Sequence, residues 1–348
     1  MGRHGYAAGA LVGVLITGLA LLFITVRTGG PPRIVNPWPL LAALGACVAT
    51  WWLQGLIVAV LARPRLERFR LLDTFRVYMA GTFVAGISPI RGAEIPLEVY
   101  LLRRLGLSAG EGSAVVGIRV LLDAAVLTPA ALCGLALTST LPGANAPGLL
   151  LAGLAILVAL AIVIFALGRR SSNVGPGRNW PGWARGGGAK ISGFLGDARR
   201  SVASYRGHRK SLAYAAALTI VYWAFRLCCG PLALMAVGWS GGWTPVIVAQ
   251  LLLASFVLPL APTPGGSGAR ELGLAALLAT HVPEGQLLSG IVVYSGLTYY
   301  LPVVVGALFA GSQLWLQLCG LPPFKGKIGE RGPRRRPTVV PARSYNGD

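Results

Sequence analysis

Long apolar stretches alternate with short polar connections along most of this chain. A helix needs about 20 apolar residues to cross a bilayer, and six stretches are long enough: 6–26, 38–62, 113–138, 147–167, 211–237 and 286–310. Two shorter apolar segments, 71–88 and 244–261, each run into a break rich in proline and glycine. The pattern therefore predicts an all-α polytopic membrane protein.

The composition agrees with this interpretation. Of the 348 residues, 54% are hydrophobic and only 12% are charged, and the mean hydropathy is +0.66. A soluble protein of this length exposes far more polar surface. A net charge of +20 would suggest nucleic acid as the partner of a soluble protein, but basic residues beside apolar spans are typical of contact with anionic lipid head groups. We therefore expect membrane lipids as partners and no nucleic acid.

The basic residues also predict the orientation of the chain. They concentrate in 168–210 and 322–348, with a smaller group in 62–70, and the positive-inside rule places such segments in the cytoplasm. The connections 139–147 and 238–243 carry no charge and are expected outside. The first apolar stretch has no small-residue cleavage site, so we expect a retained helix. The prediction is a multi-pass protein of the inner (plasma) membrane with both termini in the cytoplasm.

Counting the crossings between these two sides predicts two re-entrant hairpins. Segment 71–104 has to enter from the cytoplasm and return to it, with a turn near Pro89 and Gly92, whereas 244–282 has to enter and leave from outside. Backbone broken by proline and glycine is stable at membrane depth only inside protein or beside a wet cavity. Ordinary kinks in full-length helices are the alternative interpretation. The second turn contains Pro262, Pro264, Gly265, Gly266 and Gly268.

Hairpins that open to opposite faces are typical of an inverted-topology repeat. The segment ISPIRGAE (87–94) corresponds to LAPTPGGSGARE (260–271), and an amphipathic segment and an acidic residue followed by glycine come after each. We therefore expect a membrane domain over 1–321. Its repeat halves cover about 38–167 and 211–319 and are joined by the basic cytoplasmic loop 168–210, and a disordered basic tail follows over 322–348.

Ionisable residues within the apolar segments are few, and each needs a partner or a function there. Arg119 and Asp123 are four residues apart on one predicted helix, so they either neutralise each other or belong to a site. Arg91 and Glu94 follow the first break, and Arg270 and Glu271 follow the second. These four residues are expected to face a cavity, to cap the broken backbone or to form salt bridges.

Arg226 stands alone in the apolar sequence VYWAFRLCC. It needs either a carboxylate from another helix, Glu94 or Glu271, or an anion from outside the chain. Its planar guanidinium suits phosphate, which it can bind through two parallel hydrogen bonds. The cysteines and histidines have no metal-ligand spacing, and no catalytic constellation is recognisable. We therefore expect no catalytic residue, no metal and no cofactor.

Three blocks of sequence resemble a known family. They are SPIRGAEIPLEVYLLRRLGLSAGEGSAVVGIRVLLD (88–123), PTPGGSGARELGLAALL (262–278) and VVYSGLTYYLPVVVGAL (292–308). They are similar to the transmembrane region of lysylphosphatidylglycerol synthases, also called the flippase-like domain family, and the signature PTPGG-x-G-x-x-E is the most specific part. The resemblance implies a protein that moves an anionic phospholipid or a lipid-linked substrate between leaflets.

The chain also departs from the family in two respects. Members that synthesise aminoacyl lipids carry a large soluble catalytic domain after the membrane part, whereas this sequence continues into the basic tail, so we expect no enzyme activity. Where the family often has Tyr-Arg, this chain has Tyr294-Ser295, so a head-group contact of that arginine is absent or passes to Arg226. A homo-oligomer and a separate lipid-modifying enzyme are both compatible partners.

The predicted substrate-binding residues are Glu94, Arg119, Asp123, Arg226, Arg270 and Glu271. Two other functions fit the same architecture. One is a secondary transporter of a soluble anion, and the other is a membrane partner or regulator that transports nothing.

Overall fold

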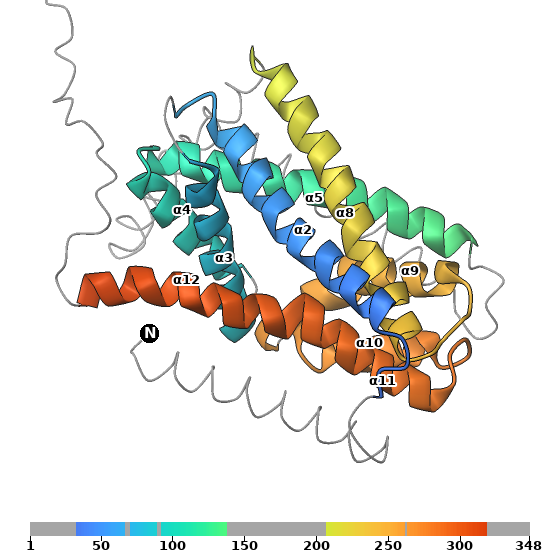
Figure 1. Ribbon diagram of the computed structural model, residues 1–348. Helices are drawn as coiled ribbons and strands as arrows, with labels where there is room; N and C mark the ends of the chain where they lie inside the picture. The colour runs from blue at the N-terminus through green and yellow to red at the C-terminus, as the bar shows by residue number, and fades with distance from the viewer. Residues whose placement is uncertain (1–32, 67–69, 89–91, 138–206, 262, 319–348) are drawn as a thin grey trace, which may run out of the picture. The chain divides into compact units, whose positions relative to one another are not determined.

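The computed structural model describes residues 33–66, 70–88, 92–261 without 138–206, and 263–318, and this part of the chain is helical without strands. Figure 1 shows its helices in order. They are α2 (Pro37–Ala62), α3 (Leu71–Ile87), α4 (Glu94–Arg104), α5 (Ala109–Leu137), α8 (Arg209–Ala236), α9 (Trp243–Leu252), α10 (Ala269–Leu278), α11 (Glu284–Ser295) and α12 (Leu301–Leu318). A π-helical turn, Gly296–Tyr300, joins α11 to α12.

Four helical spans are long and apolar enough to cross a membrane: Pro37–Ala62, Ala109–Gly134, Arg209–Ala236 and Glu284–Ala310. They coincide with the predicted spans 38–62, 113–138, 211–237 and 286–310, so the expected polytopic α-helical membrane protein is confirmed. The predicted spans 6–26 and 147–167 lie outside the described residues, as do most of the loop 168–210 and the tail 322–348.

The described residues before and after 138–206 show a similar order of elements. Each part has a long span, then a helix, a break and a second helix, then another long span. The helices on either side of each break pack against each other, α3 against α4 and α9 against α10. Each break thus lies between two helices that pack together, as the predicted hairpins require. That these units re-enter a membrane from opposite sides, and that they form a repeat, stays a prediction.

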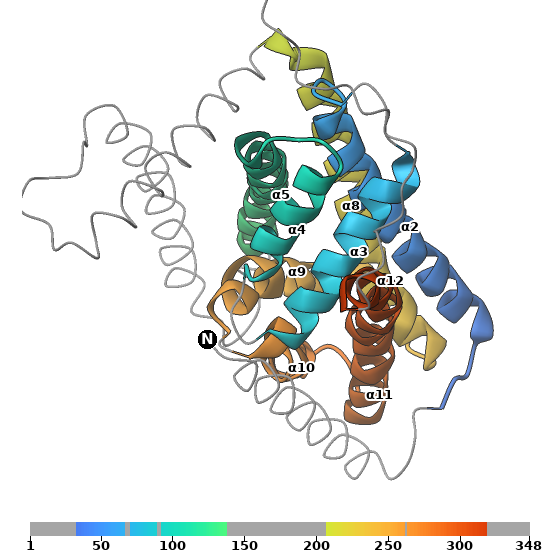
Figure 2. The same ribbon diagram turned by 90° about the vertical axis from the view of Figure 1, so that its left-hand side faces the viewer.

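The first spans of the two halves, α2 and α8, lie side by side (Figures 1 and 2). They run antiparallel, because the Val35 N–H before α2 donates to the Ala236 carbonyl at the end of α8 at 2.9 Å. Towards the other end, Ala215 of α8 shares a buried cluster with Ile57 and Leu61 of α2. The antiparallel packing of α2 and α8 is compatible with the predicted inverted repeat, which stays a prediction.

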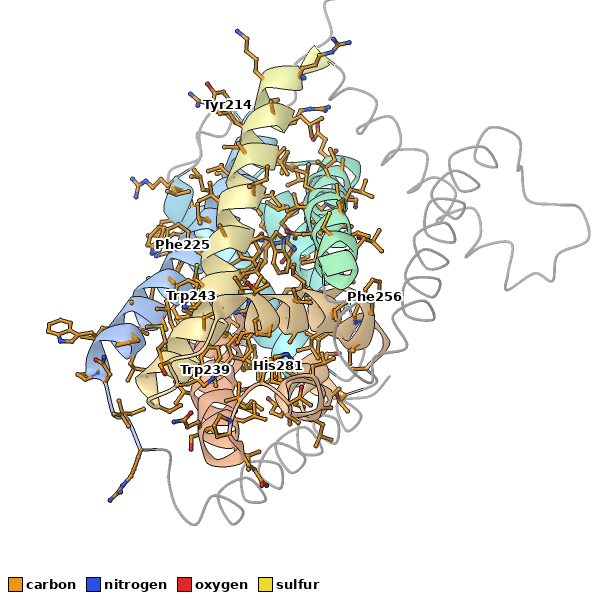
Figure 3. The ribbon with its side chains drawn as sticks, turned by 90° about the vertical axis from the view of Figure 1, so that its right-hand side faces the viewer. Tyr214, Phe225, Trp239, Trp243, Phe256 and His281 are labelled. Atoms are coloured by element: carbon orange, nitrogen blue, oxygen red, sulfur yellow. The ribbon has the colours of Figure 1, made fainter. Side chains whose placement is uncertain are left out.

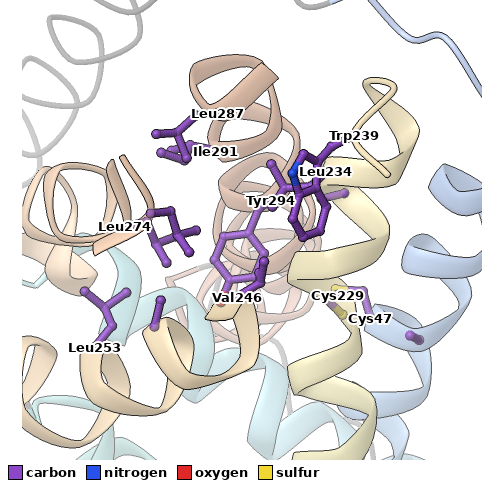
Figure 4. Packing of buried hydrophobic residues seen from close by; sticks show 14 of the residues in the cluster. Cys47, Cys229, Leu234, Trp239, Val246, Leu253, Leu274, Leu287, Ile291 and Tyr294 are labelled. Carbon is purple, nitrogen blue, oxygen red and sulfur yellow. The ribbon is translucent and has the colours of Figure 1, made fainter. Parts of the chain in front are cut away.

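A buried apolar cluster ties the second hairpin to these spans (Figure 4). Cys47 of α2 and Cys229 and Leu234 of α8 contribute from one side, and Val246 of α9 and Tyr294 of α11 from the other. Both cysteines are free thiols, so they serve as small apolar side chains here. The cluster positions the broken segments that carry the polar residues.

Large apolar and aromatic side chains also remain exposed on the spans. Tyr214 and Phe225, both on α8, are 67% and 41% exposed (Figure 3). Lipid tails are as apolar as such side chains, so a bilayer places no penalty on these surfaces. Their exposure is therefore typical of helices that contact lipid.

A proline inside α8 leaves a carbonyl without its helical donor. Pro231 has no N–H to donate to Leu227, four residues earlier. Gln250 of α9 supplies the missing donor, because its Nε2 lies 3.0 Å from the Leu227 carbonyl oxygen. Gly230 leaves the necessary room, since a Cβ at this position would collide with the Gln250 amide. The packing of α9 against α8 therefore depends on one amide side chain.

We expect Gln250→Leu to lower stability by about 1–3 kcal/mol, because the Leu227 carbonyl then loses its donor. In a Pro231→Ala background, the backbone N–H regained at position 231 can satisfy that carbonyl, so the same change should cost much less. Thermal unfolding of the detergent-purified protein, followed by tryptophan fluorescence, measures both losses. Equal losses in the two backgrounds would show that Gln250 does not stabilise the helix through this carbonyl.

Candidate functional site

The tips of the two hairpins meet beside the π-helical turn between α11 and α12. Tyr299, in this turn, contacts both tips. Its hydroxyl donates to the Gly86 carbonyl at the end of α3 at 2.7 Å. Its ring lies so close to Gly265 in the second tip that a Cβ there would collide with it. Gly265 also has a φ of 56°, which favours glycine. Gly265, the first glycine of the PTPGG signature, is therefore favoured for two reasons: its backbone conformation and its close packing against Tyr299.

Arg270 and Glu271, at the start of α10, hold the second tip together. Arg270 donates to the Gly265 carbonyl, and its guanidinium carbon lies 4.3 Å from the centre of the Tyr299 ring. Glu271 accepts a hydrogen bond from the Gly268 N–H at 2.7 Å. Both side chains are buried. Both side chains therefore bind backbone groups of the broken segment, which is one of their expected roles. Neither forms a salt bridge with another described residue.

A cavity of 160 Å³ lies where the tips meet. Its walls come from the last turn of α3, the start of α4, the second tip and the turn before Pro302. Among the described residues that line it, Glu94 is the only one with a charged side chain. Glu94 Oε2 and Thr263 Oγ1 are buried without a hydrogen-bond partner in the described part of the chain. The cavity therefore has oxygen atoms available for a ligand.

The predicted turn residues take different positions. Gly265 and Gly266 line the cavity. Gly92 and Gly268 mark the two breaks with φ values of 88° and 78°, where glycine is favoured. Pro264 begins a short 3-10 turn that continues to Gly266. Pro89 and Pro262 lie outside the described residues.

Arg119 forms an ion pair with Glu98 of α4 and none with Asp123. The distance from Arg119 Nη2 to Glu98 Oε2 is 2.7 Å, and the two residues are 7% and 2% exposed. Gly81 of α3 leaves room for the carboxylate, because a Cβ there would collide with it. Asp123 instead accepts a hydrogen bond from Trp223 Nε1 of α8 at 3.1 Å. Arg119 and Asp123 therefore form no direct ion pair, contrary to one of the two alternatives, although they remain within electrostatic range of each other.

Sequence reasoning missed Glu98. The sequence predicts an amphipathic segment after the first break, and a glutamate in such a segment is normally exposed to solvent. One signal was available, because Glu94 and Glu98 are four residues apart and so share one face of α4. Glu98 also lies within electrostatic range of Glu94 and Asp123. The acidic face of α4 thus connects the cavity with the buried ion pair.

Arg226 has no carboxylate partner among the described residues, so the expected pairing with Glu94 or Glu271 is not formed. Its Nη1 donates instead to the Thr298 carbonyl at 3.1 Å. Pro302 lacks the N–H that would normally reach a carbonyl of this turn. The neighbouring Leu297 carbonyl accepts from the Cys47 thiol, with Sγ at 2.9 Å. Arg226 therefore satisfies the backbone of a turn whose Thr298 also lines the cavity.

Tyr78 of α3 lies among these interior charges. The Arg119 guanidinium carbon is 5.7 Å from the centre of its ring. Its hydroxyl is within electrostatic range of Arg226 and Asp123 as well. The interior thus holds two adjoining polar regions, an acidic cavity at the hairpin tips and a cluster that contains two arginines. No group of histidine, cysteine and carboxylate side chains in the described residues could hold a metal ion.

The Glu98–Arg119 pair allows a direct test of this arrangement. We expect Glu98→Gln or Arg119→Gln alone to cost about 3–5 kcal/mol of stability, because each leaves a buried charge without its partner. The double change Glu98→Leu with Arg119→Met should cost less than either single change. Thermal unfolding of the purified protein measures the three losses, and Arg76→Gln, in a half-exposed pair with Asp73, serves as the control that changes little. A double variant less stable than both singles contradicts the assigned pairing.

Tyr299→Phe removes only the hydroxyl that links the π-helical turn to α3. Because one hydrogen bond contributes about 1 kcal/mol, we expect the backbone amides of 84–88 to exchange hydrogen about fivefold faster while the global unfolding midpoint changes little. Hydrogen exchange followed by mass spectrometry measures this difference. Tyr214→Phe, on the exposed surface of α8, is the matched control. Unchanged exchange at the tips would mean that the hydroxyl does not hold them together.

The chain was also compared with known proteins. Residues 7–306 match the family model described as the lysylphosphatidylglycerol synthase TM region. The matched range includes both hairpins, the Tyr299 turn and all six predicted substrate-binding residues. The search of curated proteins finds no match. Because the family model covers most of the sequence, this chain belongs to the family of the lysylphosphatidylglycerol synthase transmembrane region.

Proposed function

We propose that this chain moves an anionic phospholipid or another lipid-linked anion between the two leaflets of a membrane. The family suggests a flippase-like role in a multi-pass membrane protein. The observation that carries the proposal is Arg226, a cation on a membrane span that has no carboxylate partner among the described residues and is held by one backbone carbonyl. A guanidinium in this position suits the phosphate that such lipids share.

Arg226 is the residue that would bind the phosphate. Its bond to the Thr298 carbonyl is a single contact with a neutral acceptor, whereas a phosphate offers opposite charge and can accept two parallel N–H···O bonds. A phosphate can therefore replace the carbonyl. The exchange would release the turn at Thr298, which lines the hairpin-tip cavity. Head-group binding and movement of the hairpin tips would thus be coupled through one residue.

Arg119, Asp123 and Glu271 have supporting roles in this proposal. Arg119 is held in the buried ion pair with Glu98, and its Nε and Nη1 have no hydrogen-bond partner in the described part of the chain, so they are available as donors. Asp123 positions Trp223 through its hydrogen bond. Glu271 holds the second tip closed through Gly268, and its other carboxylate oxygen, Oε1, is buried without a partner. None of these groups is assigned a catalytic step.

The basic segments 168–210 and 322–348 would bind the anionic inner leaflet of the plasma membrane. Each basic residue near the surface contributes about 1 kcal/mol to such binding. This places both termini in the cytoplasm and orients the hairpins across the bilayer. The proposal is compatible with a homo-oligomer and with a separate enzyme that modifies the lipid.

Reconstitution into vesicles tests the function. Vesicles of phosphatidylcholine and phosphatidylglycerol carry fluorescent phosphatidylglycerol, and dithionite quenches only the label in the outer leaflet, so protein-dependent loss of protected fluorescence reports translocation. We expect Arg226→Gln and Glu271→Gln each to slow it by about tenfold or more, because each removes a buried charge that binds or positions the head group. Arg209→Gln and Glu284→Gln, both exposed, are the matched controls. Size-exclusion profiles establish that each variant is folded.

The alternatives give different results in the same vesicles. A transporter of a soluble anion leaves the lipid signal unchanged and takes up a labelled anion in response to a pH gradient. A regulator that transports nothing shows neither signal, and its cellular effect depends on the basic tail, so deletion of 322–348 abolishes that effect. Translocation that persists at the full rate in both Arg226→Gln and Glu271→Gln would refute the site.

A further inference from the structure

We infer that the hairpin-tip cavity binds a monovalent cation, either a free ion such as Na⁺ or the ammonium end of a zwitterionic lipid head group. Binding to the cavity is argued from its walls alone. Its role in transport rests on the proposed function, because a cation bound there would occupy the hairpin tips while Arg226 holds a phosphate.

The first argument is the chemistry of the lining. Glu94 is the only charged side chain among the described residues around the cavity, and the polar side chains beside it are hydroxyls. Glu94 Oε2 and Thr263 Oγ1 are buried with no hydrogen-bond partner in the described part of the chain. Carboxylate, hydroxyl and carbonyl oxygens are ligands for hard cations and acceptors for ammonium groups. A phosphate would meet the Glu94 carboxylate instead of a donor.

The second argument is the end of α3. Ala85 and Gly86, in its last turn, line the cavity. The last four carbonyls of a helix lack helical donors, and together they carry a partial negative charge. Tyr299 donates to one of them, that of Gly86, which keeps a second lone pair. Carbonyl ends of broken helices coordinate Na⁺ or H⁺ in many transporters, so the backbone adds to the attraction of Glu94.

The third argument is the arrangement of nearby positive charge. Arg270 does not line the cavity, and its guanidinium is engaged by the Tyr299 ring and the Gly265 carbonyl, with Glu271 next to it in sequence. Arg119 is neutralised by Glu98. Among the described residues, neither arginine therefore pairs with Glu94. In the described part of the chain Glu94 forms no salt bridge, and its buried Oε2 is left for a ligand.

The volume is suitable for such a ligand. A cavity of 160 Å³ is far larger than the space that one water needs. It can hold a monovalent ion with part of its water shell, or a primary ammonium group at the end of a short chain.

Binding of radioactive ²²Na⁺ to the purified full chain tests the inference. The protein is held in detergent in a low-salt buffer with sucrose in place of a background salt, and unlabelled NaCl or propylammonium chloride competes with the label. We expect saturable binding that Glu94→Gln weakens by about tenfold or more and Thr263→Val by about threefold, since the first loses a charge and the second a single ligand. Glu284→Gln and Thr280→Val are exposed counterparts that should leave binding unchanged.

The competition arms identify the source of the cation. Displacement by NaCl with no effect of propylammonium indicates a free ion, and displacement by both indicates that the site accepts a lipid ammonium group as well. If wild-type protein binds neither at about 100 mM, or if binding survives unchanged in both Glu94→Gln and Thr263→Val, the inference is overturned. If Glu94→Gln does not fold, Thr263→Val and wild-type competition decide.

The lipid assay separates this inference from the proposed function. Translocation by a protein that does not bind a cation overturns the cation site and leaves the lipid function in place. Cation binding that depends on Glu94, in a protein that moves no fluorescent lipid, supports the cation site and overturns the proposed lipid function.

Discussion

Every backbone polar group inside an apolar medium needs a partner, and this constraint governs the interior of the protein. The chain breaks its own helices with proline and glycine, and each break leaves carbonyl or N–H groups without helical partners. Side chains from elsewhere supply them. Gln250 serves the Leu227 carbonyl, Arg226 serves the Thr298 carbonyl, and Glu271 serves the Gly268 N–H. Two of these three side chains carry charge, so repair of the backbone brings ionisable groups into the interior.

This origin explains how groups that stabilise the fold can also bind a ligand. A guanidinium bonded to a neutral carbonyl is stable without a substrate, yet an anion offers it a stronger partner. The two states then differ in whether the turn before Pro302 is held or released. A permanent carboxylate partner, such as Glu98 for Arg119, removes that option because separating a buried ion pair costs several kcal/mol. Arg119, with its carboxylate partner, is therefore a structural residue, whereas Arg226 can exchange its carbonyl partner for an anion.

The sequence was a good guide to the elements and a poor guide to the partners. Long apolar runs predicted four described spans closely, and proline with glycine located both breaks, because these are local properties of the chain. The partner of Arg119 is 21 residues away on another helix, and the partner of Arg226 is a backbone carbonyl 72 residues away. A carbonyl has no signature in side-chain sequence. Only the absence of a donor at Pro302 hinted that one was available.

The two hairpins use their glutamates differently. Glu94 and Glu271 each follow a break and lie in the first turn of a short helix. Glu271 uses one carboxylate oxygen to cap its own turn, and Arg270 packs on Tyr299 beside it. At α4 the helix start has no side-chain cap, and Glu94 directs an unpaired oxygen to the cavity wall. Glu271 thus stabilises its own tip with its charge, whereas Glu94 makes no such cap and is the group assigned here to a ligand. Because the two tips differ in this way, one can hold the broken backbone while the other binds.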